Sequence, residues 1–579
     1  MVLTDSNNGL PDIDVFIAYS DVFNDFESVN PKNFIQDIPT HPLLHFAVEL
    51  QNKILYAITD YVTQKQMMAD MRPYLPPKAR KKAWDFQKEH KKCGFISCDT
   101  TLLFFQLVLS NFVPMQECHD ESELELDPTE LIGAYKALLY CNQIWINKGI
   151  TNGDNCATEL NSNPLGLYKI SLRLELPIVE FKFYKNPKTQ FYKAIQFFIF
   201  CENDKLYQQY LQYFYQDHRI SSWKEYITRL FCFFSSSVNK PYIAIDSALQ
   251  NDICFFDQFT IDITRLPQKD WKDSEWLRYL RNHFLIKTSS CQYFLLNANL
   301  LIDKMYQGMK FDFLNSLKKH NICNNKGRKY DYNVFSSELG ERFSEPQLLY
   351  PILHKCYDHI ADVILDGKSF QGIDGCPDFY IRIKDSLFLF EYKDNTLSDK
   401  IKFSRDENLM EKEITQKLCY DGKDANGNPK RKGGGQLLAT IHEILNNHTY
   451  DSFDINIAQI KRIFPIIITT DSAFSSLGVN GIVTKAFNDI ILSNNYNLSN
   501  VFVYIPTIIN IDTIINMCYP IHEGIISLQD VLIQYIDNNT YNIQPFDTFI
   551  EDYFFRTPEF RTNIMIRKEN EFLFGEYFA

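Results

Sequence analysis

The sequence lacks the features that mark membrane, secreted and nucleotide-hydrolysing proteins. No uninterrupted apolar run reaches the ~18 residues that a membrane-spanning helix needs, and residues 1–14 lack the basic patch and apolar core of a secretory signal. The 14 cysteines include no CxxC pair, so we expect no zinc ribbon and predict free, mostly buried thiols. No Walker-type phosphate loop occurs, so any nucleotide energy would have to come from a partner. We therefore expect a cytoplasmic protein that does not contact membranes.

Length and charge limit the remaining classes. The chain has 579 residues, of which 45% are hydrophobic and 23% are charged, as in a globular protein with more than one domain. Its formal net charge of −13 repels nucleic acid at long range. A protein that coats polyanions unspecifically is therefore excluded, and any binding of nucleic acid must be local.

The first half of the chain has helical periodicity. In residues 127–140, Asp127 is an expected N-cap and Glu130 completes a capping box. A strand is expected at 293–297, and polar residues 318–330 are the expected linker. Further helices are predicted at 191–200, 206–215, 223–234 and 298–307. We predict a helix-rich region at 1–325 that recognises a target, a protein partner or a second copy, that can subdivide near 243–265, and that precedes a second domain at 326–579.

The second domain alternates helices and strands, which is typical of an α/β fold. Helices are expected at 345–357 and 435–446, two β runs within 378–393, and strands at 463–469 and 500–504. The last stretch, 501–579, carries 11 acidic and 4 basic side chains. We expect it to form an acidic extension that faces away from any nucleic acid.

The most informative segment, 375–394, reads as a β-hairpin. Two β-rich runs flank a polar turn at 384–386. With a two-residue loop, Asp378 lies opposite either Glu391 or Lys393. Because strand side chains alternate between faces, Glu391 and Lys393 point the same way. Two carboxylates and one ammonium are therefore expected on one small surface.

This trio has the composition of a hydrolytic metal site. Two neighbouring carboxylates suit Mg²⁺, which keeps several waters and leaves room for phosphate oxygens. A lysine beside them can hold or deprotonate the attacking water and offset charge in the transition state. The predicted reaction is phosphodiester hydrolysis. The alternative is an ordinary surface ion pair on a hairpin, which the Pro-Asp step and the strand context disfavour.

Pro377-Asp378 and Glu391-Tyr392-Lys393 resemble the motif of the PD-(D/E)XK nuclease superfamily, which has the restriction-endonuclease-like fold. The resemblance covers about residues 337–504 and implies an α/β domain with a central mixed sheet. It implies that Asp378 and Glu391 bind Mg²⁺, with Mn²⁺ as a substitute, and that Lys393 assists the water. It further implies DNA as the substrate, with RNA not excluded, and, by analogy, bacterial defence against phage or foreign DNA.

The same family suggests two more catalytic residues. Members often place a glutamate on a helix upstream of the Asp, and Glu345 fits this place better than Glu341. Its alternative role is to favour a helix N-terminus. Many members carry a glutamine on a later helix, where this chain has Gln436. Thr440 stands where a common variant has Tyr, so Gln436 can equally be a plain helix residue.

Two basic clusters stand out in this acidic chain. The insert at 395–440 has nine basic and seven acidic side chains and can track a phosphate backbone, or it is a solvated loop. The second cluster, Lys78–Lys82, is followed by Trp84 and can bind phosphates and stack bases, although a solvated helix face is the favoured interpretation. The predicted nucleic-acid contacts of the insert are Lys400, Lys402, Lys430, Arg431 and Lys432.

The sequence thus predicts a Mg²⁺-dependent endonuclease with a C-terminal catalytic domain. Two alternatives remain open. One is a nuclease-like scaffold that senses nucleic acid or protein without cutting, and the other is an endonuclease specific for RNA or for a nucleic-acid structure. The complete Asp378, Glu391 and Lys393 set favours an active enzyme over a scaffold.

Overall fold

The structure is a computed structural model of the chain. It describes residues 4–5, 11–12, 15–55, 61–90, 93–114, 124–149, 164–176, 179, 185–237, 242–370, 373, 375–404, 406–423, 429–447, 449–494, 501–539 and 542–578. Within these ranges no helix combines the length and the apolar character that crossing a bilayer requires. The cysteines in these ranges are free thiols, most of them buried, as predicted.

The chain forms two compact units whose segments interleave. The first unit comprises Met1–Gly153, Glu180–Lys185 and Tyr215–Met309, and the second comprises Asp154–Val179, Asn186–Phe214 and Lys310–Ala579. This division differs from the single boundary near residue 325 that the sequence suggested. Helical periodicity reveals that a helix has an apolar face but not which unit covers that face, so the helices of 186–214 could not be assigned beforehand.

The predicted linker at 318–330 lies inside the second unit. Tyr330 is buried there, and its hydroxyl donates a hydrogen bond to Glu338 Oε1 at 2.9 Å. Asn324 Oδ1 accepts from the backbone amides of Lys326 and Arg328, each at 3.0 Å. The polar residues therefore make a tight turn between two helices rather than a connection between domains.

The first unit is built around helix α5 (Cys98–Leu109), all of whose residues are buried. A helix that is buried all round is covered on every side, and α2 and α6 pack against it. The predicted capping box of α6 is confirmed, because Asp127 Oδ1 accepts from the amide of Glu130 and Glu130 Oε2 accepts from the amide of Asp127. Its other main elements are α2 (Thr40–Leu55), α3 (Tyr61–Met71), α4 (Pro77–Glu89), α6 (Pro128–Gly149), α12 (Trp223–Ser237), α13 (Gln250–Asp257), α14 (Ser274–Leu280), α15 (Ala298–Asp303), and a sheet of β5 (Tyr242–Ala244), β6 (Leu285–Ser289) and β7 (Gln292–Leu295).

The second unit is centred on a six-stranded mixed sheet in the order β14-β13-β10-β9-β8, with β15 also paired to β13. β8 and β10 run antiparallel to β9, whereas β13 is parallel to β10, β14 and β15. The expected mixed α/β architecture is therefore present. The strands are β8 (Val363–Asp366), β9 (Phe379–Ile383), β10 (Ser386–Lys393), β13 (Arg462–Thr469), β14 (Phe502–Val503) and β15 (Thr507–Asn510).

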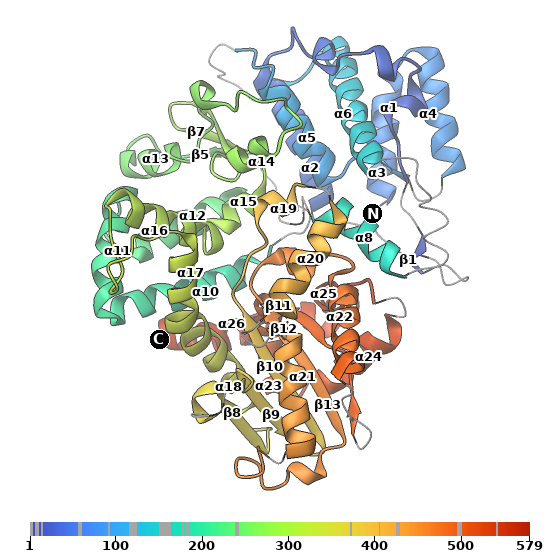
Figure 1. Ribbon diagram of the computed structural model, residues 1–579. Coiled ribbons are helices and arrows are strands. Elements are labelled where there is room, and N and C mark those ends of the chain that lie inside the picture. The colour runs from blue at the N-terminus through green and yellow to red at the C-terminus, as the bar shows by residue number, and fades with distance from the viewer. Residues whose placement is uncertain are drawn as a thin grey trace. The chain divides into compact units, whose positions relative to one another are not determined.

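The two faces of this sheet are covered by different helices. α21 contacts β10 and β13 and lies over one face of the sheet (Figure 1). Lys393, which points the same way as Glu391, contacts Gln436 of α21 on this face. α18 covers the opposite face, where the Tyr350 and Phe379 rings lie 5.8 Å apart. The main helices that lie wholly or mostly in the second unit are α8 (Pro164–Glu175), α10 (Pro187–Asn203), α11 (Lys205–His218), α16 (Gln307–Lys319), α17 (Tyr332–Leu339), α18 (Tyr350–Tyr357), α20 (Glu407–Leu418), α21 (Gly434–His442), α22 (Val479–Asn494), α23 (Ile511–His522), α24 (Leu528–Asn538), α25 (Phe546–Arg556) and α26 (Asn563–Phe578).

Two expectations for this unit need correction. The segment 501–579 is not an appended acidic extension, because it supplies β15 to the sheet and α23, which packs against α18. The single helix expected at 345–357 is a π-helix, η6 (Gly340–Leu349), followed by α18. Pro346 lies inside η6 and cannot donate a backbone hydrogen bond, which favours a locally widened turn.

Candidate functional site

The hairpin that carries the motif has the first of the two predicted registers. Ser386 pairs with Ile383 and Phe390 with Phe379 around a two-residue turn. Lys384, in that turn, has a φ of +53°, the left-handed conformation that tight hairpin turns need. Continued by one step, this register places Asp378 opposite Glu391.

Asp378 lies directly against the strand that carries the motif. Its Oδ2 accepts a hydrogen bond from the backbone amide of Tyr392 at 2.6 Å. Burial raises the pKa of Asp378, although Lys393 and the Tyr392 amide oppose the shift. The carboxylate of Asp378 therefore sits beside the backbone between Glu391 and Lys393.

Glu391 is a buried carboxylate with one satisfied oxygen. Lys393 Nζ donates to Glu391 Oε1 at 2.5 Å, whereas Glu391 Oε2 is buried and has no hydrogen-bond partner among the described residues. Burial and then the charge of Asp378 raise the pKa of Glu391 to about 8. Burial lowers the pKa of Lys393, but Glu391 and Asp378 outweigh this and raise it overall. The charged ammonium of Lys393 thus stabilises only one oxygen of the Glu391 carboxyl group, and the cost of burying the other oxygen stays uncompensated among the described residues.

Gln436 reaches the same lysine from α21. Its Oε1 accepts from Lys393 Nζ and from the amide of Gly433, both at 3.0 Å. Gly433 has a φ of +44°, and a Cβ there would lie 2.1 Å from the carbonyl oxygen of Leu418. Only glycine fits this approach. The glycines before Gln436 thus let the start of α21 sit close enough for the amide to hold Lys393.

Glu345 joins the group from the π-helix. Burial, followed by repulsion from Asp378, raises the pKa of Glu345 to about 7, and Lys393 opposes the shift. Glu341, the alternative to Glu345 on the same helix, is exposed. Hydrogen bonds connect Asp378, Glu391, Lys393 and Gln436 at the end of β10, and Glu345 interacts with Asp378 and Lys393 through its charge.

Asp394 is a neighbouring residue that sequence reasoning missed. Its Oδ2 accepts from Ser344 Oγ at 2.5 Å, its Oδ1 accepts from Thr470 Oγ1 at 2.6 Å, and Lys310 Nζ lies 3.7 Å from Oδ1. Burial raises the pKa of Asp394, but Lys310 and the two hydroxyls outweigh it and lower the pKa overall. Because Ser344 precedes Glu345, this carboxylate ties the π-helix to the end of β10. The available signal was an acidic residue directly after the motif.

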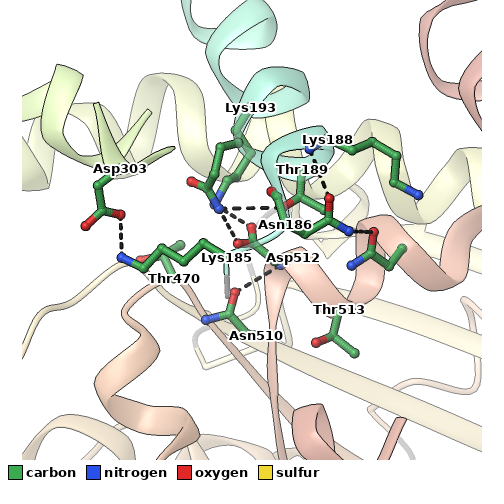
Figure 2. A network of polar contacts seen from close by, with 12 residues as sticks. Lys185, Asn186, Lys188, Thr189, Lys193, Asp303, Thr470, Asn510, Asp512 and Thr513 are labelled. Carbon is green, nitrogen blue, oxygen red and sulfur yellow. Dashed lines mark hydrogen bonds and ion pairs between the residues drawn. The ribbon is translucent and has the colours of Figure 1, made fainter. Parts of the chain in front are cut away.

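A further polar network lies on α10 and at the start of α23 (Figure 2). Buried Lys193 pairs with Asp512, whose Oδ2 also accepts from Gln190 Nε2 at 2.5 Å. The amide of Asp512 donates to Asn510 Oδ1 at 3.0 Å, which caps α23. Lys193 also helps to lower the pKa of Asp394. The positive charge of Lys193 thus adds to that of Lys310 in stabilising the ionised Asp394.

Two of these carboxyl groups are of the type that could hold a Mg²⁺ ion. The described part of the chain contains no cluster of three or more His, Cys, Asp or Glu side chains arranged to hold a metal. Mg²⁺ needs only one or two carboxylates, because it keeps several waters. Glu391, with its unpartnered buried oxygen, and Asp378, with its raised pKa, are the donors that would hold it.

The predicted nucleic-acid contacts fall into two groups. Lys430 and Arg431 are exposed on β12 (Pro429–Arg431), and Lys400 is exposed on α19 (Asp399–Lys402). Lys432 is half-buried, and its Nζ lies 2.9 Å from Asp421 Oδ2, so part of its charge is neutralised. Exposure of the first three is compatible with contact to a phosphate backbone.

Lys402 does not belong to that surface. It is buried, and its Nζ lies 3.2 Å from Asp471 Oδ2. Asp471 also accepts from the backbone amides of Leu397 and Ala473, each at 2.9 Å. We withdraw Lys402 as a nucleic-acid contact, because a buried and paired ammonium cannot reach a phosphate. The sequence could not distinguish it from a solvated lysine, since Asp471 lies far along the chain.

The chain matches no protein-family model, no curated protein and no solved structure. The chemistry of the site is therefore inferred from its own geometry.

Proposed function

We propose that the protein is a divalent-metal-dependent nuclease that hydrolyses phosphodiester bonds. The observation that carries the proposal is the meeting of Asp378, Glu391 and Lys393 at one strand end, where a buried Glu391 oxygen has no partner among the described residues. The sheet supports it, because a β9–β10 hairpin followed by α21 and the parallel strand β13 is the arrangement that the motif implies. DNA is the expected substrate, on the strength of the motif.

Each residue has a distinct part in this proposal. Asp378 and Glu391 would hold Mg²⁺, which would polarise a phosphate oxygen and lower the pKa of its water. Lys393, whose ammonium stays charged, would orient the attacking water and offset the negative charge that develops on phosphate. Gln436 would hold Lys393 in place from α21. Glu345, with a pKa near 7, would exchange a proton close to neutral pH.

The state of the carboxyl groups favours a site that binds a cation over carboxyl groups that serve only the fold. Buried carboxyl groups with raised pKa values destabilise a fold at neutral pH, and a protein that does not need them tends to lose them. In the same unit, Asp394 has hydroxyl and lysine partners that lower its pKa. The fold can therefore satisfy a buried carboxylate, and the incomplete compensation of Glu391 is better explained by a ligand that it awaits.

The first experiment is cleavage of plasmid DNA, single-stranded DNA and RNA by the purified chain with Mg²⁺ or Mn²⁺. Asp378→Ala and a chelator should each abolish cleavage. The matched control is Asp489→Ala, which removes a carboxylate of the same unit that is 60% exposed on α22. This control should cut like the wild type.

The substrate that is cut decides between the nuclease alternatives. RNA cleavage alone would replace DNA as the substrate. A wild-type chain that neither cuts any of the three substrates nor binds Mn²⁺ would contradict the proposal. Metal binding without any cleavage would favour the sensing scaffold.

A further inference from the structure

Helix α4 in the first unit presents a basic surface. Its sequence, Pro77–Glu89, contains five basic side chains and only two acidic ones, Asp85 and Glu89, in a chain whose net charge is −13. Ala79 and Ala83 are buried and mark the inner side of the helix. The five basic residues are all exposed, and they are Lys78, Arg80, Lys81, Lys82 and Lys88.

Three of these lysines form no ion pair in the described part of the chain, although Asp85 lies on the same helix. Arg80 is engaged with the carbonyl oxygens of Pro73 and Leu75, and Lys82 Nζ donates to Asn24 Oδ1. By contrast, Lys78, Lys81 and Lys88 form no ion pair with a described carboxylate. Their ammonium groups thus face solvent.

The distribution of charge at the start of α4 destabilises the helix. The positive end of the helix dipole lies at the N-terminus, where acidic side chains are favourable, yet the first turn of α4 has none and carries Lys78 instead. Lys78 also lies at i, i+3 and i, i+4 spacing from Lys81 and Lys82, where like charges repel. Local preferences that a sequence violates without structural compensation indicate a functional surface.

Trp84 lies in the same surface. It is 43% exposed, and it is on one stripe with Lys81 and Lys88 because these positions are three and four residues away from it. The Arg72 guanidinium lies 4.3 Å and Lys88 Nζ 5.0 Å from the centre of its ring. These cations fix the indole in position. A large aromatic ring thus stands, partly open to solvent, among unneutralised positive charges.

We propose that α4 binds single-stranded nucleic acid, with Lys78, Lys81 and Lys88 on phosphates of one strand and Trp84 stacked on an unpaired base. Phosphates need positive charge, and an unpaired base offers the flat face that an indole stacks on. An acidic peptide has the charge without regularly spaced planar groups. A bilayer surface would find no exposed aliphatic side chain on α4 to insert. The surface shares no residue with the proposed active site, and its binding does not depend on cleavage.

The test measures binding without chemistry. The full chain with Asp378→Asn and a chelator is titrated against a fluorescent oligonucleotide of about 20 nucleotides, which spans more than one stacking site. Lys78→Gln, Lys81→Gln and Lys88→Gln together should weaken binding at least about tenfold and reduce the salt slope by about 2, since each phosphate contact to a single strand contributes ~0.7. Trp84→Leu should weaken binding about tenfold and leave the salt slope unchanged.

The control for net charge is the triple variant Lys224→Gln, Lys269→Gln and Lys272→Gln, which removes three exposed lysines elsewhere in the first unit. It should bind like the parent. The inference is overturned if the parent does not bind single strands, or if the two triple variants bind equally well. It is also overturned if polyglutamate or phosphatidylserine vesicles bind to the parent as tightly as the oligonucleotide and lose affinity in the α4 variant to the same degree.

Discussion

Glu391, near the end of β10, and Asp394, the residue directly after this strand, are two largely buried carboxyl groups whose surroundings differ in kind. Asp394 receives two hydroxyl hydrogen bonds and faces a lysine, which together lower its pKa. Glu391 receives one hydrogen bond from Lys393, keeps a buried oxygen without a described partner, and has a pKa raised to about 8 by burial and by Asp378. The pKa is thus raised at Glu391 and lowered at Asp394, although the two residues are only three positions apart.

This difference separates structural from functional charge. A carboxylate that stabilises a fold is given donors and a counter-charge, as Asp394 is. A carboxylate that must bind a cation has to keep a lone pair free, and the fold loses stability while the cation is absent. On the proposed function, Asp394 belongs to the framework and Glu391 to the chemistry, and each role predicts a different response to mutation.

Lys393→Ala should have the largest effect. It removes the lysine that contacts Glu391, and we expect cleavage to fall by about 10³-fold or more, because proton transfer and charge stabilisation are both lost. The melting temperature and the affinity for Mn²⁺ should stay close to those of the wild type. The control is Lys461→Ala, which removes an ammonium near the hairpin turn that is 77% exposed. Cleavage by Lys393→Ala at the wild-type rate would exclude this lysine from the mechanism.

Asp394→Ala should have the largest effect on stability. It leaves Lys310 without this carboxylate and removes the acceptor of Ser344 and Thr470, so the free energy of unfolding should fall by about 3 kcal/mol. Urea unfolding of the metal-free protein at neutral pH measures the loss. Asp394→Asn, which keeps one acceptor oxygen, should lose less. An Asp394→Ala variant as stable as the wild type would remove Asp394 from the framework.

The hairpin shows how much of the site the sequence alone could predict. Alternating side chains and a two-residue turn limited Asp378 to two partners, and the structure has one of them. Gln436 was placed on its helix correctly, and the glycines before it explain its contact with Lys393. These features depend on short-range geometry, which local sequence encodes.

The features that the sequence could not predict depend on distant segments. The partners of Asp394 come from η6, α16 and the residue after β13, and the pairing of Lys402 with Asp471 joins the end of α19 to a residue that follows β13. No periodicity indicates which hydroxyl or carboxylate will meet across such separations. β15 was missed for the same reason, since its four residues become a strand only through pairing with β13.

Glu391→Gln should stabilise the metal-free protein at alkaline pH. A carboxyl group whose pKa rises from 4.5 when unfolded to about 8 when folded binds protons more tightly in the native state. Its contribution is therefore favourable below pH 4.5 and is lost as the pH rises towards 8, so metal-free stability falls across this window. The variant should flatten the decline and gain about 1–3 kcal/mol at its alkaline end. Thermal unfolding without metal, from acidic to alkaline pH, measures this.

Mg²⁺ provides the matching control for that prediction. It should raise the melting temperature of the wild type most at alkaline pH, where Glu391 is ionised, and should have little effect on Glu391→Gln. An identical pH dependence of unfolding in the wild type and the variant would contradict the contrast between Glu391 and Asp394.

The prediction with the smallest expected effect tests whether Asp394 influences cleavage by holding Glu345 in position through Ser344. Ser344→Ala removes the hydrogen bond from η6 to Asp394 and should loosen Glu345, which we expect to lower kcat about tenfold with an unchanged KM. In a Glu345→Gln background the same change should have no further effect, because the group that Ser344 positions is gone. Thr470→Val removes the other hydroxyl from Asp394 but lies off the π-helix, so it should lower stability and leave kcat nearly unchanged. Equal losses from Ser344→Ala in both backgrounds would mean that Ser344 acts through stability alone, and Asp394 would then have no influence on catalysis.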